Sequence, residues 1–490
     1  MAEYITRRMC ETISNQYHRI IEPLDKHITL NLRDGGIKTR PAKSNGLWGQ
    51  FLLPSVLILY CMLEDVPIVY KIGTCLSLGL VAYCCLFVLF LSLSSLVVRE
   101  PVYGGCVAAS FISTLFMYGA LKQDLLLSLS ASATTVLSFV WLLRHSLINL
   151  PKTFTIGEAV IVVQSVVLFT VISILHVLLG LSREDEEMYF INVSVLMVLL
   201  AVVLMITGLY LLRKELRTIK SLLIVIALGA TFVLVILHIV IGSDFMKQAI
   251  KLVFFTGKRK EIIIFWLILV LISICALMIR TKLAIKATTV TRKTFHILAS
   301  LVFLSGILFD VRLMLFASGI VLALIIFVEA LRKSEIEPIS SALQSAFLVY
   351  SDEKDCGSLA MTPLYLYIGL ACPLILVPSH SPHNTLELLS GVLSIGVGDT
   401  AASWFGSRFG FNKWPDSSRT MEGTAFNILS QIGTVYTLIL FDLLHTRNAL
   451  LRTVIVASVA GFVEAKTEQV DNLVLPLVTM AAYQITRFVL

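Results

Sequence analysis

The stretch Val195-Leu-Met-Val-Leu-Leu-Ala-Val-Val-Leu-Met-Ile-Thr-Gly-Leu-Tyr-Leu-Leu212 has no charged residue and is long enough to cross the hydrocarbon core of a bilayer as one helix. Comparable runs recur along the whole chain of 490 residues, of which 57% are hydrophobic and only 14% are charged. This composition excludes a soluble globular protein. It predicts an all-α fold, that of a polytopic integral membrane protein.

Apolar runs of sufficient length predict about fifteen membrane spans. The polar segment 1–46 has no apolar core followed by a small-residue cleavage site, so a cleaved signal peptide is not expected. Its basic residues just before the first run predict a cytosolic N-terminus. The candidate spans lie near residues 48–63, 72–98, 102–121, 125–143, 155–181, 189–212, 219–242, 261–280, 294–309, 313–331, 361–378, 385–406, 424–443, 449–463 and 473–490.

Threading these spans from a cytosolic N-terminus predicts which connections face the cytosol. The acidic segment 184–187 falls outside, and the basic segment 247–260 is the exception, expected outside as an interfacial amphipathic helix. Basic connections account for the net charge of +7, so no nucleic-acid partner is expected. The basic segments expected on the cytosolic side are 213–220, 280–293, 332–333 and 408–419.

The chain divides by its chemistry near residue 280. Residues 47–280 are predicted to form an N-terminal transmembrane scaffold, and residues 281–490 a C-terminal transmembrane catalytic region with cytosolic loops. The ionisable residues within scaffold spans are Glu158, His176 and His238, which we interpret as structural groups rather than a proton relay. The sequence contains no internal repeat of fixed period, so a solenoid is not expected.

Two polar elements of the C-terminal region lie at the ends of spans. Arg292 and Lys293 have the spacing to clamp phosphate oxygens, with His296 one turn further on, although a basic interfacial anchor explains them equally well. Asp399 follows a Gly-rich apolar run, where a carboxylate is costly unless a cation or strong donors satisfy it. Helix packing explains the glycines but leaves Asp399 unexplained, which favours a function.

The loop 406–424 and the connection 464–472 complete the polar set. The loop combines glycines and basic residues suited to phosphates with Glu422, suited to a divalent ion, and it contains no Walker A sequence. The connection carries carboxylates at helical spacing. Each element alone is compatible with a solvated loop. Two acid-bearing elements flanking a basic, Gly-rich loop favour a metal–nucleotide site.

In these elements the chain closely resembles the polyprenol kinase family. Where this chain has Asp416-Ser-Ser-Arg419, family members are expected to carry a Gly and a pair of Lys. The pieces that carry the resemblance occur in order within residues 281–490: Arg292-Lys-Thr-Phe-His296, Gly398-Asp-Thr-Ala-Ala-Ser403, Lys413-Trp-Pro415, Glu422-Gly-Thr424, Glu464-Ala-Lys-Thr-Glu-Gln-Val-Asp-Asn-Leu473 and Leu475-Pro-Leu477.

The resemblance implies an enzyme of the endoplasmic-reticulum membrane that phosphorylates the terminal hydroxyl of dolichol, with CTP as donor. It also implies a cytosol-facing site, a divalent metal (Mg²⁺ or Ca²⁺) and a product, dolichyl phosphate, that serves protein N-glycosylation. The implied catalytic residues are Asp399, Arg292, Lys293 and His296. The implied nucleotide-binding residues are Gly398, Thr400, Lys413, Trp414, Pro415, Asp416, Ser417, Ser418, Arg419, Thr420, Glu422, Gly423 and Thr424. The expected metal ligands are Asp399, Glu422, Glu464 and Asp471.

Two alternatives remain open from the sequence. A cytidylyltransferase acting on a lipid phosphate would use similar charges but would release pyrophosphate. A transporter or channel would place its polar groups near the bilayer midplane, whereas here they concentrate in connections.

Overall fold

The computed structural model describes residues 22–178, 185–283, 287–351, 354–378, 382–415 and 417–490. Within these ranges every regular element is a helix, and the β-structure is limited to one isolated bridge between Lys413 and Thr420. The predicted all-α fold is therefore confirmed. Asp416 lies outside the described residues.

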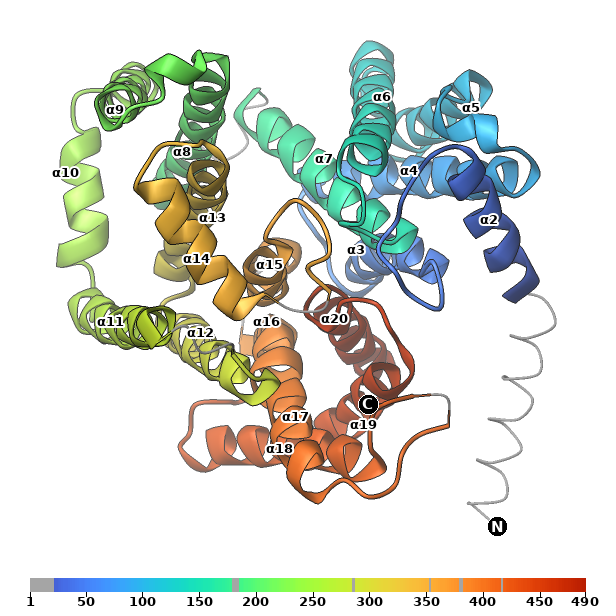
Figure 1. The fold of residues 1–490 in the computed structure, drawn as a ribbon, viewed down its shortest axis with the longest axis vertical. Coiled ribbons are helices and arrows are strands. Elements are labelled where there is room, and N and C mark those ends of the chain that lie inside the picture. Colours follow the sequence, from blue (N-terminus) through green and yellow to red (C-terminus); the bar gives the residue numbers. More distant parts are fainter. Residues whose placement is uncertain (1–21, 179–184, 284–286, 352–353, 379–381, 416) are drawn as a thin grey trace. The chain divides into compact units, whose positions relative to one another are not determined.

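By its internal contacts the chain divides into two compact units (Figure 1). The first comprises residues 22–61, Pro67–Ile172 and Cys356–Ser358. Its described helices, of which α3 and α7 extend beyond it, are α2 (Glu22–Asp34), η2 (Leu47–Phe51), α3 (Leu52–Leu63), α4 (Ile68–Leu93), η3 (Ser95–Val98), α5 (Tyr103–Leu115), η4 (Phe116–Ala120), α6 (Leu125–Asn149) and α7 (Ile156–Leu178).

The second unit comprises Met62–Val66, Ser173–Asp355 and Leu359–Leu490 and contains the C-terminal region. Its described helices are α8 (Glu186–Leu211), η5 (Lys214–Leu216), α9 (Ile219–Ile241), α10 (Phe245–Ile250), η6 (Lys251–Phe255), α11 (Arg259–Leu283), α12 (Thr289–Phe309), α13 (Val311–Lys333), α14 (Ile339–Tyr350), α15 (Met361–Leu376), η7 (Pro382–Asn384), α16 (Thr385–Leu388), η8 (Val392–Asp399), α17 (Thr400–Phe409), α18 (Met421–Leu440), α19 (Ala449–Lys466) and α20 (Asp471–Val489).

Ten helices among the described residues are long and apolar enough to cross a membrane, which supports a multi-pass protein. The finer count of about fifteen spans is not confirmed. The expected span 385–406 changes helix type along its length, from α16 through the π-helix η8 to α17, and the expected spans 48–63 and 361–378 form shorter helices, Leu47–Leu63 and Met361–Leu376. The ten helices that meet the criterion are α4, Tyr103–Ala120, α6, Ile156–His176, α8, α9, α11, Val290–Phe309, α13 and α18.

The buried acid of the first unit has a structural partner. Glu158 lies in the first turn of α7, fully buried, and its two carboxylate oxygens accept hydrogen bonds of 2.6 and 3.1 Å from the Arg40 guanidinium. Its Oε2 also accepts from the backbone N–H of Thr155 at 2.9 Å. This bidentate pair joins the segment before η2 to the start of α7, in line with the structural interpretation of Glu158.

The π-helix η8 is the element that places Asp399. It packs against α12, α17, α18, α19 and α20 of the second unit. The wide turns of a π-helix occur frequently at functional sites. Glycines allow the close approach: a Cβ on Gly398 would lie 2.6 Å from Asn427 Oδ1, and one on Gly396 would lie 2.0 Å from Ser300 Oγ. The glycines before Asp399 are thus required for packing.

Candidate active site

Asp399 ends η8 in a buried position, and its side chain is 4% exposed. The ammonium group of Lys293, in the first two turns of α12, forms an ion pair with Asp399 Oδ2. Thr288 caps α12 by accepting a 3.2 Å hydrogen bond from Thr291 N–H, which fixes the turn that carries Lys293. Two elements predicted separately from the sequence therefore meet in one ion pair.

Arg419 connects the loop after α17 to the α19–α20 connection. Its Nη1 lies 2.6 Å from Glu464 Oε1 and its Nη2 lies 2.8 Å from Asp471 Oδ2. Burial raises the pKa of the Asp471 carboxyl, but Arg419 and Lys354 beside it lower that pKa by more, so that it lies below its usual range. Both acids and the basic residue, expected from the sequence at one site, are in contact.

Two amides of α18 support this arrangement, and the sequence analysis did not single them out. Asn427 donates a hydrogen bond to Glu464 Oε2, and Gln431 Nε2 donates to Asn427 Oδ1 at 2.6 Å. Both side chains are buried. Their one-turn spacing within an otherwise apolar span was the available signal, because buried amides in a membrane helix require partners.

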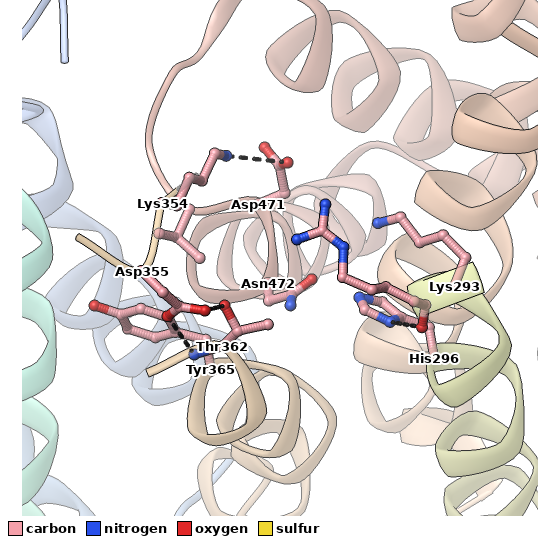
Figure 2. Close-up of a pocket in the computed structure, with 10 residues that line it drawn as sticks. Lys293, His296, Lys354, Asp355, Thr362, Tyr365, Asp471 and Asn472 are labelled. Carbon is pink, nitrogen blue, oxygen red and sulfur yellow. Dashed lines mark hydrogen bonds and ion pairs between the residues drawn. The ribbon is translucent and has the colours of Figure 1, made fainter. Parts of the chain in front are cut away.

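A small cavity, partly open to solvent, lies beside these groups (Figure 2). Asp355 and Thr362 hold one wall, where Thr362 Oγ1 donates to Asp355 Oδ2 at 2.6 Å. His296, 5% exposed, lies on α12 with its Nδ1 3.3 Å from the Arg292 carbonyl oxygen. The cavity is lined by Arg292, Lys293, His296, Lys354, Asp355, Thr362, Tyr365, Val470, Asp471 and Asn472.

The loop after α17 is braced by Glu422. The Glu422 carboxylate accepts hydrogen bonds from the backbone N–H groups of Phe411 and Asn412, at 3.1–3.2 Å, and from Asn412 Nδ2 at 2.7 Å. The Glu422 carboxylate is thus committed to the backbone and side chain at the start of the loop.

The remaining loop residues also have structural contacts. Trp414 Nε1 donates to Thr424 Oγ1 at 3.0 Å, and Thr420 caps α18 by accepting from Gly423 N–H at 3.1 Å. The Pro415 carbonyl accepts from Lys466 Nζ at 3.2 Å. In the loop, Lys413 and Ser418 are exposed and Ser417 is half-buried. Before the loop, Gly398 of η8 and Thr400 of α17 are buried.

The acidic side chains of the site offer few ligands for a metal ion. Across the described ranges, no group of three or more His, Cys, Asp or Glu side chains is arranged to hold a metal ion. Asp471 Oδ1, however, is buried and has no hydrogen-bond partner among the described residues. A carboxylate oxygen is a hard ligand, the kind that Mg²⁺ prefers. One or two carboxylates together with phosphate oxygens are enough to bind this ion. The donor set therefore fits a metal shared with a phosphorylated ligand.

Comparison with known protein families matches residues 74–413 to the family described as dolichol kinase. The chain belongs to the dolichol kinase family. The matched range includes Arg292, Lys293, His296 and Asp399. It begins well inside the N-terminal half, so the similarity to this family extends beyond the C-terminal motifs into the scaffold.

Curated members of the dolichol kinase family align with most of the chain. The dolichol kinase of Mus musculus is 31% identical over 414 residues, which cover 79% of this chain and 76% of that protein, and the dolichol kinase of Homo sapiens is 30% identical over the same shares. The dolichol kinase of Saccharomyces cerevisiae is 25% identical over 247 residues, covering 50% of this chain and 46% of its own. No solved structure matches the chain significantly.

Proposed function

We propose that this protein is a CTP-dependent dolichol kinase, which transfers the γ-phosphoryl group of CTP to the terminal hydroxyl of dolichol and releases dolichyl phosphate and CDP. The observation that carries this function is the buried Lys293–Asp399 ion pair beside the Arg419–Glu464–Asp471 cluster. Acidic and basic groups lie here at the ends of apolar helices. A polar site in this position can bind a lipid alcohol from the bilayer and a water-soluble nucleotide at the same time.

Asp399 is the residue we assign to the reacting hydroxyl. A carboxylate at this place can accept the proton of the dolichol hydroxyl or bind a metal ion, and the ion pair with Lys293 orients it. Arg292 and His296 line the adjoining cavity and would contact the phosphoryl group in transit. Phosphoryl transfer requires mainly alignment and charge neutralisation, which this set supplies.

Arg419 and the loop residues are assigned to the nucleotide. The two bonds of Arg419 to Glu464 and Asp471 use only part of the five N–H donors of its guanidinium, so it can bind a phosphate while holding both acids. Lys413 is exposed on the same loop. The contacts of Glu422 favour a role in bracing this loop over a role as metal ligand.

A divalent cation, Mg²⁺ or Ca²⁺, would neutralise phosphate charge when bound. Asp471, with its unpartnered oxygen, and one neighbouring acid, Asp399 or Glu464, would hold it together with phosphate oxygens of the nucleotide. Membership of the dolichol kinase family leads us to expect the protein in the endoplasmic-reticulum membrane. Its site should face the cytosol, because the connections around it are rich in Lys and Arg. Its product would then supply protein N-glycosylation.

The test incubates membranes containing the protein with dolichol and each of the four nucleoside triphosphates in turn. We expect dolichyl phosphate and CDP with CTP, and little product with the other three nucleotides. Release of pyrophosphate with a cytidylated lipid would instead identify a cytidylyltransferase. Absence of any lipid product would contradict the proposed function.

A further inference from the structure

Lys354 lies in the connection between α14 and α15, outside every motif that the sequence analysis singled out. Its side chain lines the same cavity as Arg292 and Lys293. In the view of Figure 2, Asp471 and Asn472 lie between Lys354 on one side and Lys293 on the other. The cavity therefore has basic groups on two walls, contributed by α12 and by this connection.

Lys354 is held loosely. Its Nζ lies 3.2 Å from the Gln469 carbonyl oxygen and 3.4 Å from Asp471 Oδ2, and both distances exceed the roughly 2.7–2.9 Å of a strong charge-assisted hydrogen bond. Asp471 Oδ2 already accepts from Arg419 at 2.8 Å, so Asp471 stays paired without Lys354. The Lys354 side chain is 31% exposed, and a ligand in the cavity can reach it.

The charges around the cavity also favour release of Lys354 to a ligand. Four carboxylates and four basic side chains lie around the cavity and its ion pairs, so their charges balance: Asp355, Asp399, Glu464 and Asp471 against Arg292, Lys293, Lys354 and Arg419. A nucleoside triphosphate carries more negative charge than one divalent cation neutralises, so its arrival adds negative charge. A basic group that can leave its present partner at little cost would compensate.

We propose that Lys354 is a further nucleotide-binding residue, which moves from Asp471 to a phosphate oxygen of the bound donor. This inference rests on the proposed function and extends the nucleotide site to a segment outside its motifs. A lysine suits the role because its ammonium is a compact charge on a flexible stem and binds phosphate as a point charge. The competing explanation is a tether that fixes the α14–α15 connection to the start of α20.

The experiment measures binding of cytidine, CMP, CDP and CTP to the purified full-length protein in detergent, with a divalent cation present. In Lys354→Ala the affinity for CTP should fall about tenfold or more, the loss should shrink as phosphates are removed, and cytidine binding should not change. Lys354→Arg should recover part of the CTP affinity, and Lys354→Gln should not. Lys282→Ala, an exposed residue at the end of α11, should match the wild type.

Two results would overturn the role of Lys354. One is an equal loss of affinity for cytidine and CTP. The other is unchanged CTP affinity in Lys354→Ala, in which case a lower unfolding temperature without nucleotide would identify the residue as a tether. Wild-type protein that binds no CTP would contradict the proposed function as well, whereas normal binding by the wild type with an unaffected Lys354→Ala contradicts this inference alone.

Discussion

Lys293 and Asp399, 106 positions apart in the sequence, form an ion pair between α12 and the end of η8, with side chains 14% and 4% exposed. Asp399 ends an apolar, Gly-rich segment in which its carboxylate would otherwise be buried without a partner. Lys293 supplies the compensating charge. Removal of one partner from a buried pair costs far more than its net attraction, because the other charge is left uncompensated.

Lys293→Ala should therefore lower the free energy of unfolding by about 3–5 kcal/mol. The double variant Lys293→Ala/Asp399→Asn should be less destabilised than Lys293→Ala, because the stranded charge is gone. Denaturant unfolding of the detergent-solubilised protein would measure the coupling, with Lys282→Ala as a control for general charge loss. Strictly additive effects would show that the two side chains do not interact.

Arg419 should affect the nucleotide more than the lipid. Arg419→Ala removes phosphate contacts and leaves Glu464 and Asp471 without their shared partner, so the KM for CTP should rise roughly ten- to a hundredfold. Arg419→Lys should recover little, because an ammonium cannot reproduce the two-acid bridge. Initial rates with each substrate varied in turn would test this. A higher KM for dolichol with an unchanged KM for CTP would mean that the two substrates are assigned to the wrong places.

Glu422 gives a test that separates bracing from metal ligation. If the carboxylate holds the backbone at Phe411 and Asn412, Glu422→Ala should chiefly raise the KM for CTP and leave the metal concentration for half-maximal activity unchanged. A metal ligand would instead show a lower kcat and a shifted metal requirement. Titration of the divalent cation at saturating CTP distinguishes the two, and a shift there would return Glu422 to the metal site.

The helical membrane fold and many of the residues at the site could be predicted from the sequence. Which of these residues contact one another could not. Asp399 was identifiable because a carboxylate in an apolar run needs compensation. Arg419 was expected on a phosphate, but its bonds to Glu464 and Asp471 depend on how α19 and α20 pack, which local patterns do not encode. Asn427 could also have been predicted, because an amide within an apolar span needs a hydrogen-bond partner.

The helix count and the α14–α15 connection show where sequence patterns lose resolution. Hydropathy cannot show that the expected span 385–406 contains the π-helix η8, because a π-helix leaves the amino-acid composition unchanged. Lys354 lies in a short charged connection that belongs to no motif, so its place on the cavity wall follows from tertiary structure alone.

The orientation of the site is testable independently of activity. The connections 280–293, 408–419 and 464–472 should all face the cytosol, since Lys and Arg bias and access to CTP point the same way. Single reporter cysteines in each connection, on a background without exposed cysteines, would be probed with an impermeant reagent on sealed microsomes. Protection of any one connection would break the model of a common site.

The central claim is that Asp399 serves phosphoryl transfer to dolichol. The most direct measurement compares the rate of dolichyl phosphate formation from γ-labelled CTP by the wild type and by Asp399→Asn, at matched amounts of inserted protein. The amide keeps the shape but cannot act as a base or as an anionic metal ligand, so we predict that label transfer is lost while CTP binding persists. Label transfer by Asp399→Asn within a few-fold of the wild-type rate would contradict this account.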